Sequence, residues 1–136
     1  HRSVSISRTS AGRFVATNAR GGTLEFGSGD DTDFTPVELL LTAIAGCSAI
    51  DVDIFTTRRS EPTQFDVVAE GDKVRDEQGN HMGPIDVTFT VRFPEGDAGD
   101  AARKVYPETV ELSHEKLCTV SRTVVLPTEV RMHVAE

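Results

Sequence analysis

The sequence predicts an α+β fold in which short antiparallel strands surround one long apolar helix. Two observations support this class. Apolar and polar residues alternate in several short segments before residue 27 and after residue 64, which is the period of half-buried strands. Between them, residues 36–57 have the composition of a long helix, with no charged residue from Leu39 to Ile50. We expect one domain over residues 1–136.

The N-terminal residues 1–34 predict a small antiparallel meander. Its apolar positions are Val4 and Ile6, then Phe14 and Val15, then Leu24 and Phe26. A Gly-Gly pair at 21–22 marks the second turn, and the polar loop 27–31 leads to the long helix.

The long helix has clear start and end signals. Thr35 is a suitable N-cap, Pro36 suits the first helical position, and Glu38 occupies the place of a capping-box carboxylate. The two arginines at 58–59 suit the negative end of a helix that stops near Thr57.

Apolar side chains surround this helix instead of forming one stripe, so we expect it to be buried on most sides. At roughly 33 Å it would cross a domain of this size, with Cys47 near the centre. One chain of 136 residues offers little further cover. We therefore infer a homodimer in which two such helices pack together between two sheets.

A hairpin is predicted after the long helix. Phe65, Val67 and Ala69 alternate in its first strand, and residues 85–93 alternate most clearly of all. The charged, glycine-containing residues 72–84 are expected to connect the two strands.

The C-terminal part predicts a second helical region and a last strand. The helical region runs from about Asp100 to Cys118, with a break or kink expected at Pro107, and residues 119–125 fit a further turn. The terminal strand is predicted from three alternating apolar residues, Val130, Met132 and Val134.

Composition excludes several classes of partner. Fourteen Lys and Arg against 22 Asp and Glu give a net charge of −8, whereas nucleic-acid binding needs a basic surface. The uncharged run is shorter than the about 20 residues that span a bilayer, so we expect no membrane partner. Two cysteines without CxxC spacing are too few for a disulfide scaffold, and they predict a reduced, cytoplasmic protein.

Cys47 and Cys118 are the candidate functional residues. A cysteine is a nucleophile only as thiolate, which needs a nearby cation, a helix N-terminus or hydrogen-bond donors. Cys47 lies too deep in its helix to use that helix's dipole, and a buried free cysteine often serves as a small apolar side chain. Alternatively, the two cysteines are a peroxidatic and resolving pair, in which a sulfenic acid condenses to a disulfide. The residues alone leave both interpretations open.

Metal binding is a third use of such residues. His81 and His114 could join the cysteines as ligands, but the four positions lack ligand spacing, and we expect no metal and no cofactor. Asp51 and Asp53 are expected either to be solvated or to pair with the arginines at 58–59.

Two segments resemble the cysteine motifs of the OsmC/Ohr family. They are Phe-Thr-Pro-Val-Glu-Leu-Leu-Leu-Thr-Ala-Ile-Ala-Gly-Cys-Ser-Ala-Ile-Asp-Val, which contains Cys47, and Ser-His-Glu-Lys-Leu-Cys-Thr-Val-Ser-Arg-Thr, which contains Cys118. The order of strands and helices agrees, so the resemblance covers nearly the whole chain. It implies an OsmC-like fold and an intertwined homodimer with two long central helices flanked by antiparallel sheets.

The resemblance also implies thiol-dependent reduction of organic hydroperoxides at two sites on the subunit interface. Cys47 matches the peroxidatic cysteine and Cys118 the resolving cysteine. In the family's hydroperoxide-resistance enzymes a Glu directly after the motif's Pro pairs with an Arg that activates the thiolate. Here that position is Val37, and the carboxylate comes one residue later, at Glu38.

The activating Arg of the family lies in a Gly-Arg-Asp-Gly turn near the N-terminus. Arg13, in Gly-Arg-Phe, is the nearest match in this chain, with Arg20 and Arg122 as alternatives. Arg13 and Glu38 therefore complete the predicted catalytic set with the two cysteines.

Three functional hypotheses follow. The first is an antioxidant thiol peroxidase that reduces alkyl or fatty hydroperoxides and is recycled by a dithiol; the resemblance suggests a dihydrolipoyl protein. The second is a non-catalytic dimer that binds a small apolar ligand at its interface. The third is a thiol redox sensor that uses the same cysteine pair.

Overall fold

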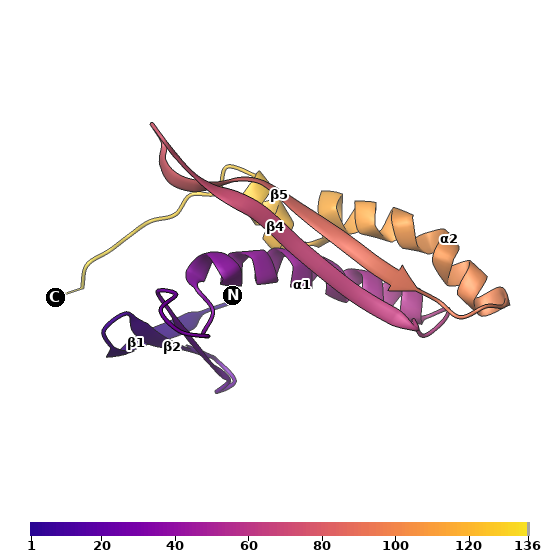
Figure 1. The fold of residues 1–136 in the computed structure, drawn as a ribbon, viewed down its shortest axis with the longest axis horizontal. Helices are drawn as coiled ribbons and strands as arrows, with labels where there is room; N and C mark the ends of the chain where they lie inside the picture. The colour runs from indigo at the N-terminus through magenta and orange to yellow at the C-terminus, as the bar shows by residue number, and fades with distance from the viewer. Residues whose placement is uncertain (136) are drawn as a thin grey trace. The chain divides into compact units, whose positions relative to one another are not determined.

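The computed structural model of the chain describes residues 1–135 and has the predicted α+β fold (Figure 1). The chain forms two compact units, His1–Thr42 and Ala43–Glu136. Helix α1 (Pro36–Thr57) begins in the first unit and ends in the second, with the bounds that the sequence predicts.

The first unit contains the predicted antiparallel meander. Strands β1 (Val4–Ser10), β2 (Arg13–Asn18) and β3 (Thr23–Gly27) are hydrogen-bonded in that order. The rings of Phe14 and Phe26 stack across β2 and β3, with 5.7 Å between their centroids. At the glycine turn, Oδ1 of Asn18 accepts hydrogen bonds from the N–H groups of Arg20 and Gly22, both at 3.0 Å.

A capping box starts α1, as predicted. The backbone N–H of Thr35 donates to the Glu38 carboxylate at 2.8 Å, and the N–H of Glu38 donates to the Thr35 hydroxyl at 3.3 Å. The Thr35 hydroxyl donates to the same carboxylate at 3.0 Å. Hydrogen bonds from the backbone and the side chain of Thr35 lower the pKa of Glu38.

One face of α1 is buried within the chain. Its buried side chains recur at every fourth residue: Ile44, Ser48, Val52 and Thr56. The expectation of burial on most sides is wrong for the single chain, where Ile50 is 62% exposed and Ile54 is 47% exposed. By length and composition α1 is apolar enough to cross a membrane, a test that the core helix of a soluble protein also passes.

A long hairpin follows α1 in the second unit. Its strands β4 (Gln64–Asp76) and β5 (Gly79–Arg92) pair antiparallel and form the two long arrows of Figure 1. The predicted connection over residues 72–84 is wrong, because only Glu77 and Gln78 lie between the strands. The charged residues of that stretch form a mostly exposed ladder, which has no buried apolar face to give an alternating pattern.

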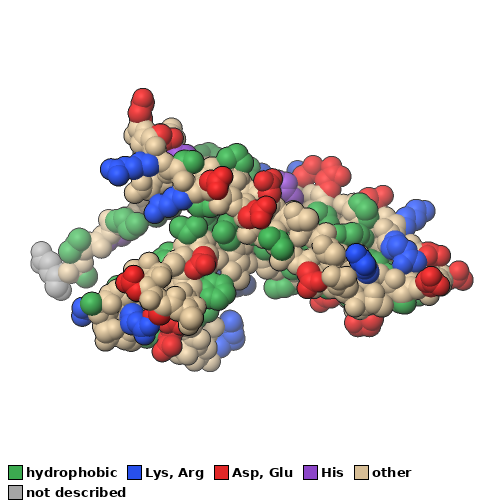
Figure 2. Space-filling view, in the orientation of Figure 1, with side chains coloured by type: hydrophobic (Ala, Val, Ile, Leu, Met, Phe, Trp, Pro, Cys, Tyr) green, Lys and Arg blue, Asp and Glu red, His purple; other side chains and the backbone are tan. Residues whose placement is uncertain are grey.

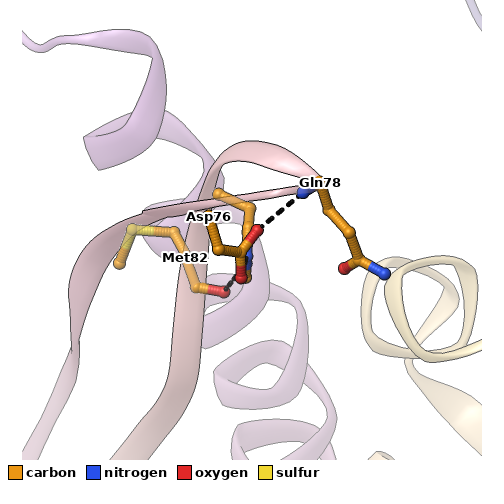
Figure 3. A network of polar contacts seen from close by, with 4 residues as sticks. Asp76, Gln78 and Met82 are labelled. Carbon is orange, nitrogen blue, oxygen red and sulfur yellow. Dashed lines mark hydrogen bonds and ion pairs between the residues drawn. The ribbon is translucent and has the colours of Figure 1, made fainter.

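Polar contacts hold the tip of this hairpin (Figure 3). One carboxylate oxygen of Asp76 accepts a hydrogen bond from the N–H of Gln78, and the other lies beside Nε2 of His81, both at 2.8 Å. Nδ1 of His81 lies 3.1 Å from the carbonyl oxygen of Met82. Both partners of the ring are acceptors, so the doubly protonated imidazolium satisfies them best. The contact with Asp76 accordingly raises the pKa of His81 and lowers the pKa of Asp76.

Helix α2 (Asp97–Leu112) packs beside β5, as Figure 1 shows. The Tyr106 hydroxyl donates to the carbonyl of Phe89 at 3.4 Å, and the Tyr106 ring meets Phe93 edge to face at 6.3 Å. Of the break or kink predicted at Pro107, the break is wrong, because α2 continues through this residue, and the kink stays a prediction. Next to Pro107, Tyr106 is fixed by its contacts with Phe89 and Phe93, and the buried Thr109 donates from its hydroxyl to the carbonyl of Val105 at 2.8 Å.

The irregularity comes after α2. Residues Ser113–Leu117 form a π-helical turn, η1, and the N–H of Cys118 donates to the carbonyl of Ser113 at 2.8 Å. The short helix α3 (Thr119–Val125) follows and confirms the further turn predicted there.

The predicted terminal strand is wrong. Residues 128–135 have no regular secondary structure, and Val130, Met132 and Val134 are 75%, 88% and 96% exposed. Alternation alone does not make a strand, because a strand needs a neighbour with free backbone groups. Figure 2 shows that apolar side chains are also exposed at other places on the face in view.

Candidate functional site

The structure brings the two predicted cysteines together in the second unit. Cys47 lies in the middle of α1 and is half-buried, whereas Cys118 precedes α3 as its N-cap and is completely buried. Both are free thiols, and they lie close enough for each to shift the pKa of the other.

Hydrogen-bond donors gather around the sulfur of Cys118. The N–H of Ser121 donates to this sulfur at 3.3 Å. Burial raises the pKa of Cys118, but hydrogen bonds from Cys47, from the side chain and backbone of Ser121, and from Ser48 outweigh it. The pKa of Cys118 is therefore lowered, and its thiolate is the favoured anion of the pair.

The surroundings of Cys47 act in the opposite direction. Burial is the main cause that raises the pKa of Cys47. Its hydrogen bond with Cys118 raises the pKa further, and the N–H of Val120 lowers it. The negative charges of Cys118 and Asp51 raise it by smaller amounts. Cys47 is thus the protonated, more accessible partner of the pair.

A second polar contact joins the elements that carry the two thiols. The hydroxyl of Ser113 is completely buried and donates to a carboxylate oxygen of Asp51 at 2.7 Å. The N–H of Ser113 donates to carbonyls at the end of α2, and its own carbonyl accepts from the N–H of Cys118. Asp53 is exposed, which agrees with one of the two expectations. Asp51 is half-buried, and it binds Ser113 instead of an arginine.

Arg13 and Glu38 have local partners within the first unit. Arg13, on β2, forms an ion pair with Asp31. Glu38 is bound to Thr35 in the capping box of α1. The predicted role of Arg13 and Glu38 in activating Cys47 stays a prediction.

The structure does not bring the two candidate histidine ligands together with the cysteines. His114 is exposed on η1, and His81 is bound to Asp76 at the hairpin tip. Within residues 1–135, no group of three or more His, Cys, Asp or Glu side chains is placed to hold a metal ion.

Three buried serines around the thiols were not predicted from the sequence: Ser48, Ser113 and Ser121. Serine is usually exposed, so nothing in its type marks these positions as buried. Two of the three carried a local signal. Ser48 directly follows Cys47, and Ser121 stands three residues after Cys118, where an N-cap side chain accepts a backbone N–H.

The chain is similar in sequence to proteins of one family. The profile of the family described as OsmC-like protein matches residues 29–133. An uncharacterised protein of Mycobacterium tuberculosis is 30% identical over 133 residues, which cover 96% of this chain and 94% of that protein.

Solved structures share the fold. An OsmC-like protein of unknown function from Vibrio cholerae matches with a TM-score of 0.72 at 13% identity, over 95% of both chains. The organic hydroperoxide resistance protein OhrB of Bacillus subtilis matches with a TM-score of 0.58 at 18% identity, over 96% of this chain and 95% of that one. At these identities the likeness shows the fold alone, and it confirms the predicted OsmC-like fold.

Proposed function

The chain belongs to the OsmC-like protein family, and on that basis we propose that it is a thiol-dependent peroxidase that reduces organic hydroperoxides. One observation carries the proposal: a half-buried thiol, Cys47, interacts with a buried thiol, Cys118, that is surrounded by hydrogen-bond donors. The Bacillus subtilis protein with the same fold is named for organic hydroperoxide resistance, which supports the choice of substrate class.

In the proposed mechanism Cys47 attacks because it is the more accessible sulfur. Its proton first passes to the Cys118 thiolate along the contact between the two thiols. The Cys47 thiolate then attacks the terminal oxygen of the hydroperoxide, and the O–O bond breaks. The leaving alkoxide takes the proton that Cys118 holds, so the products are an alcohol and a sulfenic acid on Cys47.

Cys118, again a thiolate, resolves this intermediate. It attacks the sulfur of the Cys47 sulfenic acid, the S–O bond breaks, and hydroxide leaves as the disulfide forms. A dithiol reductant, such as a dihydrolipoyl protein, then supplies two electrons and two protons and restores both thiols.

We further propose that the active form is a cytoplasmic homodimer. The open face of α1, with Ile50 and Ile54, and the alternating apolar residues after 128 are exposed in the single chain and suit an interface with a second copy. Apolar walls at that interface would favour alkyl hydroperoxides over hydrogen peroxide. Two free cysteines fit a reducing compartment.

One observation favours a second candidate, a non-catalytic dimer that binds a small apolar ligand. Arg13 is paired with Asp31 and Glu38 with Thr35, so in the chain as it stands neither is free to activate a thiolate. A redox sensor, the third candidate, would use the same cysteine pair without turnover.

Cumene hydroperoxide distinguishes these candidates. Reduced protein, Cys47→Ser and Cys118→Ser are incubated with the peroxide and dithiothreitol, and peroxide loss and free thiols are followed. The peroxidase consumes peroxide in a manner that depends on Cys47. Equal consumption by wild type and Cys47→Ser would sink the proposal, and oxidation of the wild-type thiols for one turnover only would favour the sensor.

A further inference from the structure

We propose that Asp51 is a positioning residue for the thiol pair: by binding Ser113, it fixes the turn that carries Cys118 against the helix that carries Cys47. This role deepens the proposed function, but it requires only that the two thiols form a reversible disulfide.

The first support is the way in which Ser113 is held. Its side chain has no exposed surface, and its hydroxyl donates to Asp51 across 62 residues of sequence at 2.7 Å. Its carbonyl accepts the N–H of Cys118 at 2.8 Å. Through one buried residue, the carboxylate on α1 is therefore two hydrogen bonds away from the backbone of Cys118.

The second support is the shape of the turn. A π-helical turn is rare, and it is frequently found at functional sites. Here the wide turn Ser113–Leu117 ends at Cys118, and Ser113, its first residue, is the one held by Asp51. Within residues 1–135, this is the one hydrogen bond between side chains of α1 and η1. Loss of it would free the turn to move relative to Cys47.

The third support is the place of Asp51 on α1. It follows Cys47 by four residues, so both side chains lie on the same side of the helix. The charge of Asp51 raises the pKa of Cys47, and the titratable groups that act on Cys47 are Asp51 and Cys118. Asp51 therefore has two separable properties, an acceptor oxygen for Ser113 and a negative charge near Cys47.

The test measures disulfide formation without peroxide. Each protein is equilibrated with reduced and oxidised glutathione, and the fraction with a Cys47–Cys118 disulfide is measured by acid quench, alkylation and mass spectrometry. Glutathione disulfide accepts two electrons and two protons from the thiols and leaves as two glutathione molecules. The variants are Asp51→Ala, Ser113→Ala and Asp51→Asn, which keeps an acceptor oxygen and loses the charge. Asp53→Asn is the matched control on the same helix.

We expect Asp51→Ala and Ser113→Ala to lower the disulfide equilibrium constant about tenfold, as loss of a hydrogen bond to a charged group implies. Asp51→Asn should stay within about threefold of wild type, because its amide oxygen still accepts from Ser113. Asp51→Asn should also shift the pH profile of Cys47 alkylation to lower pH. Asp53→Asn should leave both the disulfide equilibrium constant and the alkylation profile unchanged. A merely structural role would not move the alkylation profile.

Two outcomes would overturn this role for Asp51. One is a wild-type equilibrium constant in a folded Asp51→Ala variant, with folding checked by circular dichroism. The other is an Asp51→Asn variant whose disulfide equilibrium constant falls as far as that of Ser113→Ala and whose pH profile of Cys47 alkylation is that of wild type. If Asp51→Ala does not fold, the disulfide equilibrium constants of Asp51→Asn and Ser113→Ala are compared instead, and they decide whether Asp51 has this role. A protein that forms the disulfide but consumes no cumene hydroperoxide would refute the peroxidase and leave the role of Asp51 intact.

Discussion

Cys118 is completely buried and Cys47 is only half-buried, yet Cys118 has the lower pKa of the two. Burial raises the pKa of a thiol, so burial alone would make Cys118 the weaker acid. The hydrogen bonds that Cys118 accepts from Ser121, Ser48 and Cys47 outweigh it. The accessible sulfur therefore keeps the proton, and the protected sulfur holds the charge.

Removal of the Cys118 thiol should make Cys47 more acidic. Burial and the interactions with Cys118 raise the pKa of Cys47 above its ordinary value of 9.0. In Cys118→Ser the competing thiolate is gone and the new hydroxyl can donate to Cys47, so the pKa should fall. The measurement is the rate of iodoacetamide modification of Cys47 against pH, followed by mass spectrometry of its peptide. An unchanged profile, or a shift to higher pH, would show that the thiols do not interact in solution.

The same variant should trap the first intermediate of the proposed cycle. Without Cys118 no thiol of the chain can attack the Cys47 sulfenic acid, so one equivalent of cumene hydroperoxide should leave Cys47 with one added oxygen atom. Dimedone should label Cys47 in Cys118→Ser and leave wild type largely unlabelled, because wild type closes its disulfide. Equal labelling of both proteins would contradict the resolving role of Cys118.

The capping box at the start of α1 should contribute to stability. Thr35→Ala should lower the free energy of unfolding in urea by about 1 kcal/mol, the typical cost of losing an N-cap. The pKa of Glu38 is lowered, so its contribution is fully present above the ordinary value of 4.5 and is lost as pH falls through the lowered value. Glu38→Gln should therefore differ from wild type in stability at pH 7 and converge with it in acid.

Activity measurements on the same variant test the predicted catalytic role of Glu38. If the carboxylate only caps the helix, Glu38→Gln keeps its rate of cumene hydroperoxide reduction within about twofold of wild type at pH 7. A loss of more than about tenfold at unchanged stability would assign Glu38 to the activation of Cys47.

The hairpin tip should be ordered over a defined pH range. The raised pKa of His81 means that its charged contact with Asp76 is fully present below the ordinary value of 6.5 and is lost as pH rises through the raised value. The lowered pKa of Asp76 means that the contact is lost again as pH falls through that lowered value. NMR titration should give His81 a midpoint above 6.5 that falls in Asp76→Asn, with little change in global stability because both groups are exposed. If the titration midpoint of His81 is the same in Asp76→Asn and in wild type, His81 and Asp76 do not form this contact in solution.

The open face of α1 should be a contact between two copies of the chain. In a homodimer a charge at Ile50 or Ile54 would be buried without a partner, so Ile50→Glu and Ile54→Glu should shift the protein toward monomer. Sedimentation equilibrium should give twice the chain mass of 14.7 kDa for wild type and for the control Asp53→Asn. A wild-type mass of one chain, or dimers that tolerate both glutamates, would contradict this interface.

Local signals explain which elements could be predicted from the sequence. The bounds of α1 follow from Thr35, Pro36 and Glu38, which act within one turn, and the meander follows from its alternation and its glycine turn. The break or kink at Pro107 was predicted from the proline alone, whereas α2 runs through it and its neighbour Tyr106 binds the carbonyl of Phe89. The terminal strand was predicted from alternation, but no described neighbour in this chain pairs with it.

The candidate site was predictable only in part, for a physical reason. The spacing of Cys47 and Cys118 says nothing about their distance in space, and only the resemblance of both motifs to one family linked them. The effect of Ser48 on Cys118 and the bond from Ser113 to Asp51 are tertiary contacts between distant segments. Such contacts leave no periodic pattern in a single sequence.

The π-helical turn before Cys118 also limits how the length of this segment can vary. Its hydrogen bonds span five residues, one more than those of a regular α-helix. Deletion of one residue within Ser113–Leu117 would restore a regular helix and turn everything after it by about 100° about the helix axis. In the shortened chain α2 would continue as a regular α-helix, and the sulfur of Cys118 would be turned away from the sulfur of Cys47. In related chains that keep both thiols, substitutions within this segment should therefore be tolerated more readily than any change in its number of residues.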